Sequence, residues 1–130
     1  MTKAKALSFL VLLLGFSFAP SMYAHHGYAA YDLTQTLTVT GTVTELSIQN
    51  PHSTLGFDVK DEKGEVSHWA VEFGIPRALA AEGWTKETLK PGDEIKVTVH
   101  PVKNGAHIGV LVGKITYSDG RALPVHPAKE

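Results

Sequence analysis

Apolar and polar residues alternate along short segments of the chain, and glycine, proline and other turn-forming residues bound these segments. Between residues 37 and 43, leucine, valine and glycine occupy every second position, and threonines fill the positions between them. This period of two predicts a strand over residues 37–48. The next apolar residues are Leu46 and Ile48, so the pattern shifts by one residue. The shift predicts a bulge between Gly41 and Glu45 that bends the strand.

Four further strands and one short helix follow from the same kind of pattern. The strands cover residues 54–60, 65–73, 94–101 and 108–117, and the helix covers residues 76–82. Gly83 provides a stop for the helix, and Thr85 is expected to cap a further helical turn over residues 86–89. The order β-β-β-α-β-β, with a bent first strand, is typical of the five-stranded Greek-key barrel called the OB-fold. We therefore expect an all-β fold with one short helix; another small β-barrel or sandwich is the alternative.

The first residues have the pattern of a secretory signal. Lys3 and Lys5 precede an apolar run over residues 7–18, and Pro20 stands a few residues before the small residue Ala24. The run is shorter than the roughly 20 residues that a membrane-spanning helix needs. We expect a signal peptide over residues 1–24, a lead-in over 25–35, a barrel over 36–123 and a loose tail over 124–130. Cleavage after Ser21 is the alternative to cleavage after Ala24.

Composition narrows the class of protein. Without residues 1–24 the chain has 106 residues, 10 basic and 13 acidic side chains, and a net charge of −3. This balance argues against binding to nucleic acid, which depends on basic side chains. No cysteine is present, so disulfides and thiolate metal sites are excluded. We expect a monomer in the bacterial periplasm, with a metal ion, a small molecule or another periplasmic protein as its partner.

Histidines are the chain's main candidates for chemistry, because seven are many for a domain of this size. With cleavage after Ala24, His25 gains a free α-amine, which can bind copper together with its ring. In an OB-fold the loops after the first and fourth strands flank the ligand-binding face, and strand parity turns Glu72 outward near the same rim. The expected metal ligands are His25, His26, His52, His100, His107 and Glu72, with copper favoured over zinc.

Each of these histidines also has a simpler interpretation. The terminal pair can bind metal adventitiously, because chain ends are often disordered. The ring of His52 can bond a loop carbonyl, and His100 and His107 can be solvated positions without a role. The aromatic residues have structural interpretations: core packing for Trp69 and Trp84, and anchoring of the lead-in for Tyr28 and Tyr31.

Several short motifs also resemble those of a family of small exported bacterial proteins of unknown function. The motifs are His25-His26 with Tyr28 and Tyr31-Asp32, Gly41-Thr42-Val43, Asn50-Pro51-His52, Trp69-Ala70-Val71-Glu72, and Gly83-Trp84 with Leu89-Lys90-Pro91-Gly92-Asp93. The His-His start and the Asn-Pro-His loop are the most specific of them. The resemblance covers essentially the whole mature chain and implies an exported OB-like domain, without a known reaction.

Two functions remain open from the sequence. The first is a periplasmic protein that binds copper or another transition metal through His25 and the loop histidines. The alternative is a metal-free binding module for a small molecule or a protein partner. The sequence contains no nucleophile elbow, metalloprotease helix, phosphate loop or Rossmann glycine pattern, so we do not expect an enzyme.

Overall fold

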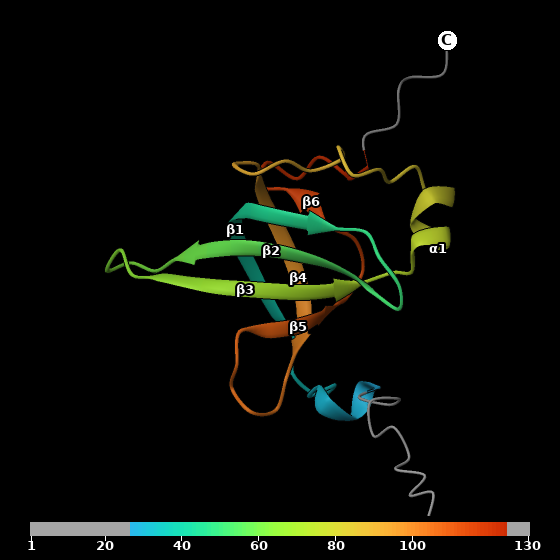
Figure 1. Ribbon diagram of the computed structural model, residues 1–130. Helices are drawn as coiled ribbons and strands as arrows, with labels where there is room; N and C mark the ends of the chain where they lie inside the picture. Colours follow the sequence, from blue (N-terminus) through green and yellow to red (C-terminus); the bar gives the residue numbers. More distant parts are fainter. Residues whose placement is uncertain (1–26, 125–130) are drawn as a thin grey trace, which may run out of the picture.

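The computed structural model describes residues 27–124, and these form a small barrel with one short α-helix and one 3-10 helix (Figure 1). The predicted signal, His25, His26 and the end of the predicted tail lie outside the described residues. The elements are η1 (Tyr28–Ala30), β1 (Leu37–Ser47), β2 (Ser53–Lys60), β3 (Val66–Phe73), α1 (Pro76–Ala81), β4 (Glu94–Pro101), β5 (Ile108–Leu111) and β6 (Thr116–Tyr117). Within the described range no helix is long and apolar enough to cross a membrane.

The strands close into a five-stranded barrel in the order β1-β2-β3-β5-β4, and β1 pairs with β4 to complete it. The β1–β2, β2–β3, β1–β4 and β4–β5 pairs are antiparallel, whereas β3 and β5 are parallel. The remaining strand, β6, adds a short antiparallel pairing to β4. This order and the single parallel pair confirm the predicted OB-like barrel.

The long first strand belongs to both halves of the barrel because it bends. Its first half pairs with β4, from Leu37 opposite Val99 to Thr42 opposite Glu94, and its second half pairs with β2. The register with β2 shifts between Val43 and Glu45, which confirms the predicted bulge. A bulge increases the local twist of a strand, and the twist lets β1 pass from one partner to the other.

The core lies inside the barrel and extends under α1. Its most deeply buried side chains come from inward positions of four strands and from the loops on either side. Alternation along each strand puts these residues on one face, as the sequence pattern predicts. The cluster comprises Val43, Leu55, Phe57, Val71, Phe73, Leu79, Trp84, Leu89, Ile95, Val97, Val99, Ile115 and Leu123.

One prediction about secondary structure is wrong. The predicted strand over residues 108–117 is divided into β5 and β6, because the chain turns at Gly113, whose φ is +73°. The predicted turn after Thr85 forms as a single hydrogen-bonded turn, in which the Thr88 amide donates to the Thr85 carbonyl at 3.1 Å. The Thr85 hydroxyl caps it by accepting a hydrogen bond from the Glu87 amide at 3.2 Å.

The lead-in packs along the loop between β4 and β5. The Asp32 amide donates to the Pro101 carbonyl at 2.8 Å, and the Lys103 amide donates to the Ala30 carbonyl at 3.0 Å. Tyr31 is buried and forms an isolated bridge with Val102. Tyr31 therefore anchors the lead-in as predicted, whereas Tyr28 is 68% exposed.

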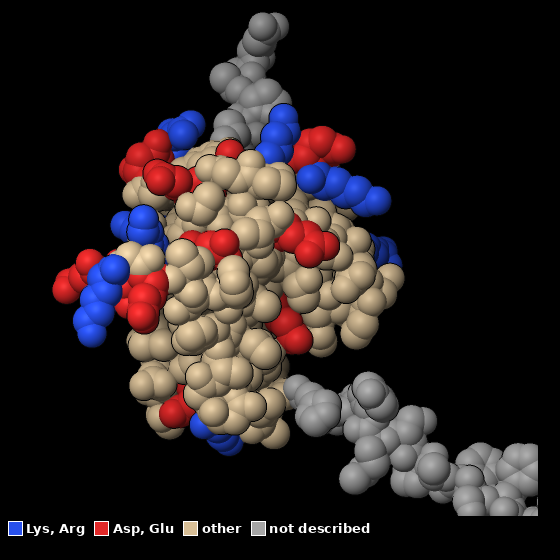
Figure 2. Space-filling model, turned by 60° about the vertical axis from the view of Figure 1, so that its left-hand side comes forward, with Lys and Arg blue, Asp and Glu red and all other residues tan. Residues whose placement is uncertain are grey.

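Acidic and basic side chains are interspersed on the face shown in Figure 2, and neither sign covers a continuous area there. The lower part of this face is mostly uncharged. A surface on which the two signs are interspersed produces no strong long-range field of one sign.

Candidate functional site

His52 and Glu72 face each other at one rim of the barrel. His52 lies in the loop between β1 and β2, and Glu72 lies one residue before the end of β3. The His52 Nδ1 and the Glu72 Oε2 are 3.9 Å apart, and their side chains are 58% and 41% exposed. The pair is accessible from solvent, and both groups can bind a metal ion or a polar ligand.

Local hydrogen bonds hold this loop against the end of β3. The Ser53 amide donates to the Gly74 carbonyl at 3.0 Å, and the Gln49 amide donates to the Ser53 Oγ at 3.3 Å. Ser53 is fully buried, so its hydroxyl fixes the loop from inside. Since β2 and β3 pair with Thr54 opposite Glu72, the histidine that precedes Ser53 is placed beside the Glu72 carboxylate.

Two tyrosines from the lead-in complete this corner. Tyr28, Tyr31, His52 and Glu72 line a hollow of about 180 Å³, together with Gly27, Phe73, Gly74 and Val110. Burial raises the pKa of the Tyr31 hydroxyl, and hydrogen bonding to the negative Glu72 carboxylate raises it further. The Tyr31 phenol is therefore neutral at physiological pH.

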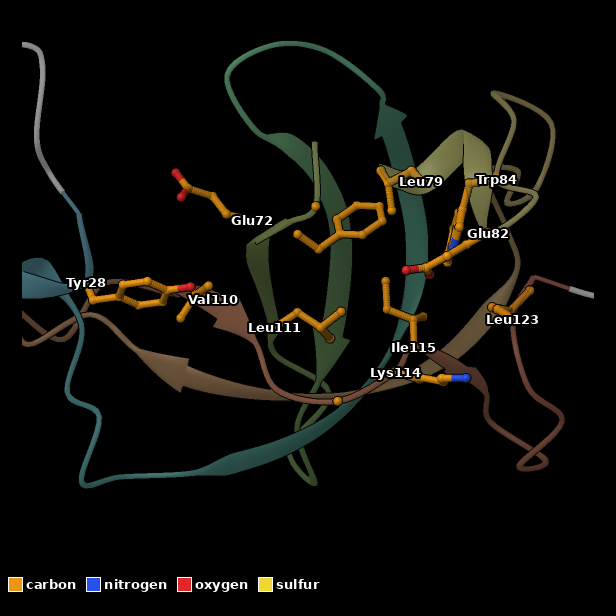
Figure 3. Close-up of a pocket in the computed structure, with 13 residues that line it drawn as sticks. Tyr28, Glu72, Leu79, Glu82, Trp84, Val110, Leu111, Lys114, Ile115 and Leu123 are labelled. Atoms are coloured by element: carbon orange, nitrogen blue, oxygen red, sulfur yellow. The ribbon is translucent and has the colours of Figure 1, made fainter. Parts of the chain in front are cut away.

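A second hollow, of about 270 Å³, adjoins the first beneath α1 (Figure 3). The two hollows share Tyr28, Glu72, Phe73, Gly74 and Val110, so they are parts of one depression. In Figure 3, Tyr28 and Glu72 lie at one end of it, Trp84 and Leu123 lie at the other, and Leu111 lies between them. We refer to the whole depression as the barrel-mouth groove.

The other described histidines make contacts elsewhere. The His100 Nδ1 donates to the Gln35 carbonyl at 2.8 Å, and the His107 ring stacks on Trp69 with centroids 5.1 Å apart. His68, on the outer face of β3, donates to the Asp58 carboxylate on β2. Each ring thus has a local partner.

The structure therefore brings together only part of the predicted metal site. Within residues 27–124, no group of three or more histidine and carboxylate side chains is close enough to hold a metal ion. His52 and Glu72 do meet, as strand parity predicts, but His100 and His107 do not join them. His25 and His26 lie outside the described residues, and the first described residue, Gly27, lines the hollow beside His52.

Sequence reasoning missed the apolar part of the groove. Trp84 was expected to be a core-packing residue; Phe73, Leu79 and Trp84 are all buried, and each also lines the groove. Phe73 and Trp84 meet edge to face, with ring centroids 5.2 Å apart. No local pattern distinguishes a core residue from a groove residue, because the difference depends on where β5 leaves β3.

Comparison with known proteins places the chain among uncharacterised proteins. A family model matches residues 14–112, and it is described as a family of unknown function, DUF6152. The comparison with curated proteins gives no match. The match spans most of the chain, from the apolar segment through β5.

Proposed function

The chain belongs to this family of unknown function, and we propose that it is an exported periplasmic protein that binds a transition metal, copper in preference to zinc. The proposed ligands are His25, His26, His52 and Glu72. The apolar segment before the described domain supports export, because it has the length and flanks of a signal peptide.

One observation carries the metal proposal: His52 and Glu72 lie together beside Gly27, directly after His25-His26 in the chain. Consecutive Cα atoms are about 3.8 Å apart, so the length of the chain before Gly27 allows both histidines to reach the hollow that Gly27 lines. The described pair supplies one imidazole and one carboxylate. The preceding residues would add two imidazoles and, after cleavage at Ala24, an amine.

The donor set suits copper. Imidazole and amine nitrogens are preferred by divalent copper, which takes tetragonal arrangements of nitrogen and oxygen ligands. Zinc accepts the same side chains, but it prefers four tetrahedral ligands. Tyr31 lines the same hollow as Glu72, and polar groups next to a carboxylate ligand can orient it.

The first experiment is a copper titration of the tag-free mature chain whose first residue is His25. We expect one tightly bound copper ion per chain. An otherwise identical chain with one alanine added before His25 loses the amine from the site and should bind at least about tenfold more weakly. Equal affinity of the two chains would refute the role of the amino terminus, and the mass of the exported protein checks its first residue.

The alternative is a metal-free binding module, and the barrel-mouth groove favours it. Phe73, Leu79 and Trp84 line a space that a small organic molecule could fill. A metal-free module predicts no change in melting temperature with copper or zinc. Metal binding predicts a clear increase in melting temperature, because a ligand at a hundredfold excess over its dissociation constant adds about 2.7 kcal/mol to the free energy of unfolding.

A further inference from the structure

A third hollow lies between the end of the lead-in and the loop that joins β4 to β5, two segments that run side by side (Figure 1). Its volume is about 340 Å³, larger than either part of the barrel-mouth groove, and it shares no lining residue with them. Ligand pockets typically have volumes of about 300–1,000 Å³, and the loop between the fourth and fifth strands borders the usual ligand site of an OB-fold. We refer to this space as the β4–β5 hollow, and its lining includes Asp32, Gln35, Leu37, Trp69, Lys103 and His107.

Hydrogen bonds fix the two sides of this hollow relative to each other. Two backbone hydrogen bonds, of 2.8 Å and 3.0 Å, join the lead-in to the loop next to Asp32 and Lys103. The His100 Nδ1 donates to the Gln35 carbonyl at 2.8 Å, which holds the end of the lead-in against β4. A ligand therefore meets a preformed frame, and little affinity is lost to ordering of the backbone.

Three stacked rings lead from the core to this hollow. The ring centroids of Phe57 and Trp69 are 6.4 Å apart, and those of Trp69 and His107 are 5.1 Å apart, with planes inclined by 15° and 21°. Phe57 is 1% exposed, whereas His107 is exposed at the surface. Trp69 covers one face of the His107 ring, and within residues 27–124 no second aromatic ring stacks on the other face. The His107 ring is therefore a fixed platform on which a flat ligand ring can lie.

Polar groups of both signs accompany this platform. Asp32 contributes a carboxylate, Lys103 an ammonium group and Gln35 an amide to the lining. The Asp32 Oδ1 accepts hydrogen bonds from the Thr34 amide at 3.0 Å and from the Thr34 hydroxyl at 2.6 Å, which orient the carboxylate. One positive and one negative group give no strong preference for an anion or a cation. Together with the amide they can bond hydroxyl groups both as donors and as acceptors, so the set favours a neutral ligand rich in hydroxyls.

A sugar ring combines the two features that this hollow accommodates. The face of a pyranose ring carries C–H groups that pack on an aromatic ring, and its hydroxyls project sideways toward polar groups. In β-linked glucose the ring substituents are equatorial, so both faces of the ring are flat. An aromatic ligand would also pack on His107, but it would leave the polar side chains around it without partners.

We propose that the β4–β5 hollow binds a neutral saccharide of β-linked glucose units. One sugar ring lies on the exposed face of His107, and its hydroxyls bond to Asp32, Gln35 and Lys103. Leu37, which is 37% exposed, adds an apolar contact. The inference goes beyond the metal proposal and does not depend on it, because the hollow shares no lining residue with the hollow at His52.

The test is an NMR titration of the isotope-labelled, metal-free mature chain with cellotriose as the probe. We expect the amide signals of Gln35 and of the loop over residues 103–107 to shift with one dissociation constant of about 1 mM or lower. Unchanged signals at about ten times that concentration would overturn the proposal. Tighter binding of indole than of cellotriose would identify an aromatic site and would overturn the assignment to a saccharide.

Histidine variants test the platform. His107→Ala should weaken cellotriose binding at least about threefold, whereas His107→Tyr, which restores a flat ring, should bind within about twofold of the unmodified chain. His68→Ala is the matched control, because the His68 side chain is 83% exposed on the outer face of β3 and does not line the hollow. Equal affinities of His107→Ala and His68→Ala would overturn the role of the ring.

A variant of the lead-in tests the polar side of the hollow. Gln35→Ala should weaken cellotriose binding about two- to tenfold, because it removes the amide group. It keeps the bond from His100, which ends on the Gln35 backbone carbonyl. Unchanged affinity would contradict the proposed hydroxyl contacts.

The saccharide and metal proposals fail separately in these measurements. His52→Ala should weaken copper binding and leave cellotriose binding unchanged, and His107→Ala should do the reverse, because His52 and His107 line different hollows. Copper binding without cellotriose binding removes only the saccharide proposal. Cellotriose binding without copper binding removes only the metal proposal.

Discussion

Gly41 is one of the glycines at which the barrel leaves no room for a side chain. An added Cβ would lie 2.6 Å from the Asp58 backbone oxygen and 2.6 Å from the Phe57 Cδ2. The Phe57 ring is in the centre of the core, and the oxygen belongs to the neighbouring strand β2, so neither can move away freely. Gly41→Ala should therefore force β1 and β2 apart next to the bulge.

The expected cost follows from the two close contacts. Overpacking a well-packed site typically costs about 1–3 kcal/mol, and a clash with backbone belongs at the upper end. Alanine recovers up to about 1 kcal/mol because glycine is the more flexible residue in the unfolded chain. The net loss should be about 2 kcal/mol, which corresponds to a melting temperature lower by roughly 8–16 °C for a domain of this size.

The assay is urea unfolding of the mature chain, with melting temperature as a second measure. Gly27→Ala is the matched control, because an added Cβ at Gly27 meets nothing within 4 Å and its φ is −52°. The control should change the unfolding free energy by less than about 0.5 kcal/mol. Equal stability of Gly41→Ala and Gly27→Ala would refute the idea that the β1 bend requires glycine at this position.

Two further predictions concern the core and the buried tyrosine. Leu55→Ala should lower the unfolding free energy in urea by about 2–5 kcal/mol, because Leu55 is fully buried and its removal leaves a cavity; a loss below 1 kcal/mol would contradict the described core. The folded state raises the pKa of Tyr31 above its ordinary value of 10.0, so Tyr31's contribution to stability is complete below pH 10 and is lost as pH rises above it. Tyr31→Phe should consequently lose less stability than the wild type between pH 9 and 11, measured by urea unfolding at each pH; parallel curves would contradict this.

The barrel could be predicted because its determinants are local. The threonine alternation and the phase shift before Leu46 specify a bent strand, and β4 matches its predicted bounds, 94–101. The division between β5 and β6 could not be predicted, because residues 110–112 are all apolar and fit a continuous strand. The strand ends where β5 stops pairing with β3, and β6 begins where the chain pairs with β4 again.

The site was only partly predictable for a similar reason. His52 and Glu72 lie close together because His52 directly precedes β2 and strand parity puts Glu72 on the outward face of the neighbouring strand β3. The rings of His100 and His107 instead turn to Gln35 and Trp69, and their positions depend on the path of the lead-in and of the following loop. A sequence pattern specifies the face on which a residue lies more readily than the neighbour that its side chain selects.

The proposal that copper binds at the His52–Glu72 rim is tested most directly by the copper affinity of matched histidine variants. The measurement is the copper dissociation constant of the mature chain, His52→Ala and His100→Ala, determined by competition with a chelator of known affinity. His52→Ala should bind copper at least about tenfold more weakly, because outer contacts alone typically account for 10–100-fold. His100→Ala should remain within about twofold, because its ring already bonds the Gln35 carbonyl. Unchanged affinity in His52→Ala, or an equal loss in both variants, would contradict a metal site at the His52–Glu72 rim.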